Sequence, residues 1–344
     1  MNKFTRYITN FCKRSIYLIY YIKQLDRQKF RKFYQFVRQT RGYSSFFLIR
    51  DILKSVYKDN IGLMDYFVFR FYEKSDEERS EWAGTGFIYE YHLKMNPKST
   101  RHLLANKIDF YEAYGPFVKH ATCTIEDLKQ NNHKAHKVLH NPSGRIVIKN
   151  ALGQCGWDVE VLKSKGDDIA ALIKHMSDKG FDLTEEYILQ HHDLAKLSAS
   201  GLNTVRVITQ LNKNNEVEIL GARLRISVNS HVDNLASGNI AVPIELETGK
   251  TYGAGVYSDI TKEDVSEHPV SGVALSGFQI PFWKEIIEIA KRAALLHPEN
   301  RSIGWDVAIS ESGPEFIEGN HNWCKILWQL PVKRGLKKTL YQYM

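Results

Sequence analysis

The sequence predicts an α+β protein of two domains, or of one large composite domain, that follows a basic helical segment. The 344 residues exceed a typical domain of about 100–200 residues. Charge is divided unevenly: residues 1–60 hold 14 Lys and Arg against 3 Asp and Glu, whereas the other 284 residues hold 33 against 36. From about residue 145 the apolar pattern changes from helical spacing to short strands that alternate with helices.

The composition is that of an ordinary globular protein. Hydrophobic residues make up 43% of the chain and charged residues 25%, which excludes a disordered or collagen-like protein. The longest apolar run near the start, Ile16–Ile22, has seven residues, whereas a membrane-spanning helix needs about 20. With no secretory signal and four widely spaced cysteines, we expect a cytoplasmic protein. Because the body is near neutral, the net charge of +8 does not indicate a nucleic-acid partner.

Residues 1–60 are predicted to form basic amphipathic helices. Apolar and aromatic side chains such as Phe11, Ile19 and Phe33 recur at helical spacing, with Lys and Arg between them. One interpretation is a solvated helical face packed on the body. The alternative is a helix that lies on an anionic membrane surface, at the inner face of the membrane, which basic residues beside Tyr and Phe would suit.

Residues 61–125 are expected to mix helices with loops and to provide part of a lid. Asn96–Thr100 has the composition of a turn that precedes a helix start. A further helix is predicted from Lys107 to Tyr114, and the Gly115-Pro116 pair ends it.

Residues 126–192 are predicted to form a small subdomain. Its expected elements are strands at 145–149, 159–162 and 186–190 and a helix at 167–178 that ends at Gly180. Residues 193–344 are predicted to form a second subdomain, in which a helix near 281–296 accompanies strands. Those strands are expected at 204–209, 217–227 and 238–246 and in a terminal hairpin of residues 303–309 and 315–320.

The terminal hairpin is the most informative place for chemistry. Asp306 lies on its first strand, and Glu318 and Asn320 share one face of its second strand. Asp306 is expected to come opposite residues 318–320, so the three oxygen donors can converge. Two carboxylates and an amide carbonyl are ligands suited to Mg²⁺. Taken alone, such carboxylates can equally pair with surface cations.

Cationic residues near glycines offer a second candidate site. Lys149 ends an apolar strand just before a loop that contains Gly153 and Gly156, where a lysine and open backbone N–H groups can meet a phosphate. An exposed strand-end lysine is the alternative. Arg206 and Arg223, with Arg225 beside them, lie on two strands and can clamp an anion or pair with nearby glutamates.

Together these features resemble the ATP-grasp superfamily: a helix-opening lysine, a strand-end lysine about forty residues later, a glycine loop, a polar hinge and a terminal D…E-x-N hairpin. Several segments are similar to the sugar-transfer-associated ATP-grasp family, which is found in polysaccharide gene neighbourhoods. The resemblance covers about residues 100–335. The segments that carry it are Asn203–Thr209, Asp233-Asn234, Gly238–Val242, Gly277–Trp283, Ile303–Ile309 and Phe316–Trp323.

The resemblance implies an ATP-grasp fold, in which two α+β subdomains clasp ATP, and it assigns residues to roles. Lys107 and Lys149 would contact the ATP phosphates, with Gly153 and Gly156 in the loop that covers them. Gln190–Asp193 would be the hinge that reads adenine through its main chain, with Asp193 near the ribose; Gln190 stands where many ATP-grasp enzymes have Glu. The remaining implied roles are Mg²⁺ ligation by Asp306, Glu318 and Asn320, and support of the transferred phosphoryl group or the acyl-phosphate by Arg206 and Arg223.

The implied activity is an ATP-dependent ligase that forms an amide through an acyl-phosphate and releases ADP and phosphate. The family's surroundings suggest a carboxylated sugar or sugar nucleotide, such as a hexuronate, and an amino acid or amine as substrates, with the product entering a capsule or O-antigen. Two alternatives are a kinase that phosphorylates a sugar or alcohol, and a non-catalytic scaffold of a polysaccharide assembly complex.

Overall fold

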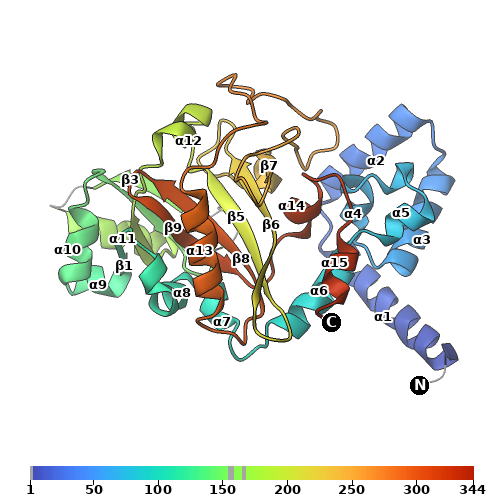
Figure 1. Cartoon of the computed structure of the whole chain (residues 1–344), viewed down its shortest axis with the longest axis horizontal. Helices are drawn as coiled ribbons and strands as arrows, with labels where there is room; N and C mark the ends of the chain where they lie inside the picture. The colour runs from blue at the N-terminus through green and yellow to red at the C-terminus, as the bar shows by residue number, and fades with distance from the viewer. Residues whose placement is uncertain (1–2, 154–158, 165–167) are drawn as a thin grey trace.

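The computed structural model describes residues 3–153, 159–164 and 168–344. Within this part of the chain, a helical N-terminal region lies at one end, a four-stranded sheet at the other, and a five-stranded sheet between them (Figure 1). Neighbouring strands are antiparallel in both sheets. The α+β class expected from the sequence is therefore confirmed.

The N-terminal region is helical, as predicted. It begins with α1 (Lys3–Lys23), α2 (Arg27–Arg41) and α3 (Ser45–Asp59). Asp26 caps α2 by accepting a hydrogen bond from the Lys29 backbone N–H, and Gly42 ends that helix in the left-handed conformation at φ 66°. Within the described residues, none of the helices combines the length and apolarity that crossing a membrane requires.

Short helices close the N-terminal region over a core of its own. They are α4 (Leu63–Val68), the 3₁₀ helix Phe71–Glu73 and α5 (Asp76–Ser80). Their buried aromatic side chains pack against one face of α2 and α3. The core includes Phe33, Val37, Leu48, Ile52, Val56, Tyr66, Phe67 and Phe71.

The segment that follows is attached to the large sheet. It contains α6 (Thr85–Met95), α7 (His102–Ala105), α8 (Lys107–Ala113) and the 3₁₀ helix Gly115–Phe117. The Ala83 backbone N–H donates to Gln329 Oε1 at 2.9 Å, and Asn96 Nδ2 donates to the Ser302 carbonyl at 2.8 Å. These buried contacts attach residues 83–96, which lie within the region expected to provide part of a lid, to the large sheet and the C-terminal helices.

The small sheet has the strand order β1-β4-β2-β3. Its elements are β1 (Thr122–Thr124), α9 (Ile125–Lys129), α10 (His133–Leu139), β2 (Arg145–Lys149), β3 (Val159–Lys163), α11 (Ile169–Lys179) and β4 (Leu183–Glu186). The strand predicted at 186–190 was wrong in position, because β4 instead ends at Glu186. Leu183 and Thr184 are fully buried against β1 and β2, which fixes the strand there.

The large sheet has the order β7-β6-β5-β8-β9. Its strands are β5 (Thr204–Leu211), β6 (Val217–Ile226), β7 (Ile240–Ile244), β8 (Ser302–Ser310) and β9 (Gly313–Asn320). Short helices accompany it: α12 (His192–Leu197), the 3₁₀ helix Leu235–Ser237, α14 (Lys325–Gln329) and α15 (Lys337–Tyr341). The amphipathic helix α13 (Trp283–Ala294) packs on one face (Figure 1).

The central strand β5 is buried at every position. Val205 and Val207 pack toward α13, whereas Ile208 joins a second cluster with Trp323 and Trp328. Because successive side chains along a strand point to opposite faces, the residues that alternate with Val205 and Val207 point away from α13. That opposite face carries the charged residues of the candidate site.

Candidate active site

A row of charged residues crosses four strands of the large sheet. Arg223 is paired with Arg206, Arg206 with Asp306, and Asp306 with Glu318, in register across β6, β5, β8 and β9. Residues directly opposite on neighbouring strands point to the same face. Asp306 therefore meets the second hairpin strand within the range expected from the sequence, and Gly304 pairs with Asn320.

Asp306 is buried and held by two arginines. Arg206 Nε donates to Asp306 Oδ1, and its Nη2 lies 2.8 Å from Oδ2. Arg225 Nη1 donates to the same Oδ2 at 2.7 Å, and Arg225 Nη2 lies 2.7 Å from Asp233 Oδ1. Burial acts to raise the pKa of Asp306, but the guanidiniums of Arg206 and Arg225 hold that pKa well below its ordinary value. Asp306 is thus an ionised carboxylate.

Glu318 has a different environment from its neighbour. Partial burial, and then the charge of Asp306, raise the pKa of Glu318 above its ordinary value. Lys107 Nζ lies 3.9 Å from Glu318 Oε2, and Asn320 Nδ2 lies 3.2 Å from Oε1. Two adjacent carboxylates that repel each other would both be stabilised by a cation placed between them.

The donor set fits a divalent cation. A carboxylate offers about four lone-pair positions, and the arginines take three of those on Asp306, which leaves one on Oδ1. Glu318 is one-third exposed and can contribute its oxygens, and the Asn320 side chain lies beside it. Hard oxygen ligands of this kind suit Mg²⁺.

The two predicted phosphate-binding lysines approach from the other side. Lys107 is the first residue of α8, and its Nζ donates to the Gly153 carbonyl at 2.5 Å. Burial lowers the pKa of Lys107, and Glu318 opposes that shift only in part. Lys149 ends β2, is 8% exposed, and lies 2.6 Å from Glu185 Oε1. Gly156, predicted in the same loop as Gly153, falls outside the described residues.

Glu185 is a site residue that the sequence did not reveal. It is 5% exposed, and its Oε1 also accepts a hydrogen bond from the Tyr111 hydroxyl at 2.5 Å. Burial acts to raise the pKa of Glu185, but Lys149 and then His120 lower it below its ordinary value. If β4 had been placed correctly, Glu185 would have been predicted on the strand next to the one that Lys149 ends. The position of β4 was thus the feature of the sequence that could have identified Glu185.

Behind Glu185 lies a buried histidine. His120 Nδ1 is 2.7 Å from Glu315 Oε2, and its Nε2 is 4.0 Å from Glu185 Oε2. His120 Nε2 has no hydrogen-bond partner among the described residues. His120 therefore lies between a carboxylate of β9, to which it is hydrogen-bonded, and the carboxylate that holds Lys149.

The predicted hinge is built around an internal amide. Gln190 Nε2 donates to the Ser198 carbonyl at 2.9 Å, and its Oε1 accepts from Asn203 Nδ2 at 2.9 Å. The backbone N–H of His191 donates to the Ile309 carbonyl at 2.7 Å. The structure thus engages the Gln190 side chain inside the fold rather than leaving it free for a ligand.

Asp193 lies at the surface of the hinge. Its Oδ1 is 3.2 Å from His192 Nε2 and 3.3 Å from Lys196 Nζ. The rings of His191 and His192 stack with centroids 4.3 Å apart. One potential ligand atom from each of His191, His192 and Asp193 lies within 4.8 Å of the other two.

Arg223 is not brought into the charged cluster. Its Nε lies 3.2 Å from the Trp328 carbonyl, its Nη2 donates to the same oxygen, and its Nη1 donates to the Ala222 carbonyl at 2.7 Å. Arg223 had been expected to support the transferred phosphoryl group together with Arg206, but Arg225, two residues further along β6, is the arginine of this strand that reaches Asp306. The two arginines share a face, and α14 covers the one at position 223.

A model of the sugar-transfer associated ATP-grasp family matches residues 87–343, which is well over half of the chain. The chain belongs to this family. Membership confirms the expected ATP-grasp fold, and the matched region contains both sheets and every residue of the charged cluster. The basic helices α1–α3 lie outside it. No curated protein sequence matches the chain.

Solved structures with a similar fold include several ATP-grasp enzymes. The biotin carboxylase domain of 2-oxoglutarate carboxylase from Hydrogenobacter thermophilus, solved with ADP and its magnesium salt, aligns with 78% of this chain and 57% of its own at 14% identity and a TM-score of 0.44. N5-carboxyaminoimidazole synthetase from Staphylococcus aureus, solved with ADP, aligns with 64% of this chain and 45% of its own, at 10% identity and a TM-score of 0.40. The L-amino acid ligase from Bacillus licheniformis aligns with 64% of this chain and 41% of its own, at 12% identity and a TM-score of 0.38. The chain spans about half the length of these proteins.

Proposed function

We propose that this protein is an ATP-dependent carboxylate–amine ligase that forms an amide through an acyl-phosphate. The observation that carries the proposal is the convergence of buried cations and carboxylates from both sheets and from α8 on one site. Lys149 reaches it from the small sheet, Lys107 from α8, and Arg206, Asp306 and Glu318 from the large sheet. Lys107 interacts electrostatically with Glu318, Lys149 and Glu185 and so connects these groups. Membership of the ATP-grasp family supports reading this cluster as a nucleotide phosphate site.

The charge balance of the site supports ATP bound together with Mg²⁺. Among the residues that the structure describes, ion pairs there join four cations to four carboxylates. A triphosphate alone would add negative charge to a balanced, largely buried cluster, which is unfavourable in a medium of low polarity. Adding the triphosphate with divalent cations keeps the balance. Asp306, Glu318 and Asn320 would hold the metal, which supplies charge neutralisation across the phosphates.

The lysines and Arg206 would serve phosphoryl transfer by position and charge. In the first step a carboxylate oxygen of the substrate attacks the γ-phosphorus, the bond from that phosphorus to the bridging oxygen breaks, and ADP leaves. Lys107 and Lys149 would stabilise the negative charge on the phosphates, and Arg206 that on the transferred group. Glu185 would fix the Lys149 ammonium in place through the 2.6 Å ion pair.

The second step forms the amide. The amine nitrogen attacks the acyl carbon, the bond from that carbon to the phosphate oxygen breaks, and the amine loses a proton as inorganic phosphate leaves. Water must be kept from the acyl-phosphate during this step. We place the reaction in the cytoplasm, where ATP is available.

The family's association with sugar transfer supports a carboxylated sugar as the acyl donor. We therefore propose a hexuronate, carried on a nucleotide or a lipid, as the carboxylate and an amino acid or simple amine as the acceptor. The product would be a building block of a capsule or O-antigen.

The test is ADP release by the purified protein with Mg²⁺-ATP and a panel of UDP-hexuronic acids, each with and without mixed amino acids. The Glu318→Gln variant should lose activity, whereas the Glu126→Gln variant, altered at an exposed helix position far from the cluster, should keep it. ADP that depends on both substrates supports the ligase. ADP released with a sugar alone, together with a phosphorylated sugar, would establish the kinase instead. ATP binding without turnover on any pair would favour the scaffold.

A further inference from the structure

Helix α1 exposes an apolar stripe along most of its length. Ile8, Phe11, Ile19 and Ile22 follow the spacing of one helix face, with Ile16 at its edge. Their side chains are between 45% and 67% exposed, whereas Tyr21 on the opposite side is buried at 9%. The helix projects from the body at its N-terminal end (Figure 1). The amphipathic pattern of α1 is therefore directed outward.

Helix α3 exposes a second stripe beside the first. Phe46, Ile49 and Leu53 lie on one face, with exposures of 77%, 51% and 39%, and Tyr57 continues the spacing. The two stripes meet where the Phe11 ring stacks on Tyr57 with centroids 5.1 Å apart. Ser15 Oγ also lies 3.1 Å from the Tyr57 hydroxyl oxygen. We call the joined stripes the α1–α3 apolar surface.

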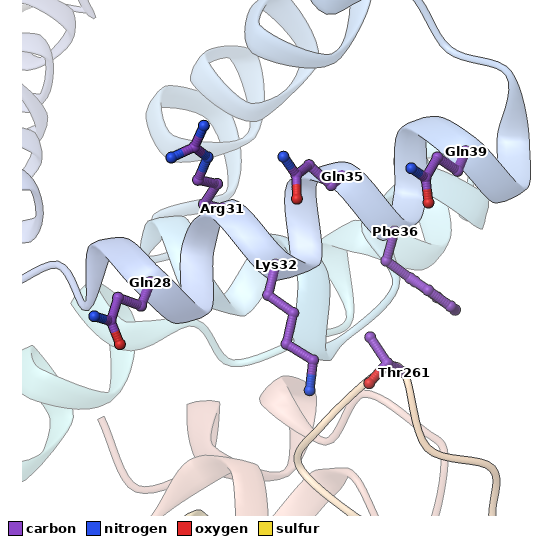
Figure 2. Close-up of a pocket in the computed structure, with 7 residues that line it drawn as sticks. All are labelled: Gln28, Arg31, Lys32, Gln35, Phe36, Gln39 and Thr261. Carbon is purple, nitrogen blue, oxygen red and sulfur yellow. The ribbon is translucent and has the colours of Figure 1, made fainter.

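The neighbouring helix α2 shows that this exposure is selective. Its outward face carries Gln28, Arg31, Gln35 and Gln39, which line a shallow groove together with Lys32, Phe36 and Thr261 (Figure 2). Lys32 points from the same face toward the loop after β7 and pairs with Asp259 at 2.6 Å. No large apolar side chain of α2 is exposed as those of α1 and α3 are. Only α1 and α3 of these three helices combine an amphipathic pattern with an uncovered apolar side.

Cationic residues border the apolar surface. Lys23 lies between Ile16 and Ile19 in the angular order of α1, and Arg50 adjoins the stripe of α3; both are exposed. Residues 1–60 as a whole carry a net charge of +11. Apolar side chains rimmed by cations are complementary to a bilayer interface, where acyl chains lie beneath anionic headgroups. A contiguous apolar patch with such a rim is uncommon on a free surface.

We propose that the α1–α3 apolar surface binds an anionic lipid bilayer, with both helices lying in the plane of the interface and their apolar side chains inserted below the headgroups. This inference is independent of the ligase proposal, because it rests on residues outside the family match. It would bring the catalytic domains to substrates carried on membrane lipids.

The test is co-sedimentation of the full chain with vesicles of phosphatidylcholine alone and of phosphatidylcholine mixed with phosphatidylglycerol. We expect binding to the mixed vesicles and little to the neutral ones. Ile16→Ser/Ile19→Ser should weaken binding by at least about tenfold, because two half-exposed isoleucines no longer insert. Lys23→Glu/Arg50→Glu should weaken binding at low salt and reduce its salt dependence.

A matched control replaces two apolar residues of similar exposure elsewhere: Val270→Ser/Leu295→Ser, at 60% and 50% exposure, should bind as the parent does. Circular dichroism melting would verify that all variants remain folded. Absence of vesicle binding, or equal binding by the helix and control variants, would overturn the proposal. So would a dimer, seen by sedimentation velocity, that Ile16→Ser/Ile19→Ser abolishes, since the surface would then cover a second copy of the chain.

Discussion

The ion pair between Lys149 and Glu185 allows two roles of Lys149 to be tested separately: its contribution to stability and its proposed contact with the ATP phosphates. Lys149→Met removes the ammonium and leaves Glu185 buried at 5% exposure, with the Tyr111 hydroxyl as a hydrogen-bond donor and with His120 and the charge of Lys107 further away. Breaking a buried ion pair from one side costs about 3–5 kcal/mol, mostly because the other charge stays uncompensated. We expect the free energy of unfolding to fall by about this amount at neutral pH.

The pH dependence of that loss has a definite sign. In the parent protein Glu185 has a lowered pKa, so its contribution to stability is present above the unfolded pKa and is lost as pH falls through the folded pKa. In Lys149→Met, we expect burial, the largest influence on this group, to outweigh His120 and Tyr111 and to raise the Glu185 pKa above its unfolded value. The folded variant then binds a proton more tightly than the unfolded chain, so the variant is least impaired near pH 4 and loses stability as pH rises.

The assay is urea unfolding at several pH values, combined with ATP binding in the presence of Mg²⁺. Lys149→Met/Glu185→Gln, in which neither residue is charged, should recover most of the stability of the single variant and flatten its pH dependence. It should not recover ATP binding, because no cation remains at the end of β2. A double variant that binds ATP like the parent would refute the phosphate-binding role, and a single variant with parental stability would refute the argument about the buried pair.

Three further outcomes follow from other parts of the structure. Glu318→Gln should lower ATP affinity in the presence of Mg²⁺ but change it little in EDTA, which isothermal titration would measure, because the carboxylate is expected to act through the metal. Gly304→Ala should destabilise the fold by about 1–3 kcal/mol in urea unfolding, since a Cβ there would lie 2.7 Å from Trp323 Cβ. Arg79→Ala should cost about 3–5 kcal/mol, because its two 2.8 Å bonds to the carboxylate of Asp51 are lost in a buried setting; parental melting behaviour would contradict this.

The terminal hairpin was predictable because its information is local. A short turn brings adjacent strands together, so the approach of Asp306 to Glu318 could be anticipated within two residues from spacing alone. The bulge between Asp306 and Val307, which sets the final register, could not be anticipated. Helices α8 and α13 were equally local, with a cap or a clear apolar period in the sequence.

The remaining features depend on contacts between distant segments. β4 pairs with β1 and β2 rather than with a sequence neighbour, so its position could not be inferred from its own residues. Glu185 was missed for that reason. Arg223 and Arg225 share a face and cannot be distinguished by periodicity. They are distinguished by α14, which lies more than 100 residues further along the chain. Its Trp328 carbonyl accepts hydrogen bonds from the Arg223 guanidinium.

The hinge shows how such a distant contact also accounts for a departure from the family pattern. Many ATP-grasp enzymes have Glu at the position of Gln190, but here the side chain must both donate and accept. Its Nε2 donates to the Ser198 and Gly201 carbonyls, and its Oε1 accepts from both the backbone and side-chain N–H groups of Asn203. A glutamate carboxylate could accept the hydrogen bonds from Asn203, but it has no N–H group to donate to the carbonyls of Ser198 and Gly201. Glutamine at this position therefore joins the end of the small subdomain to Asn203, just before β5. The prediction that this segment reads adenine rests on its main chain and not on this side-chain amide.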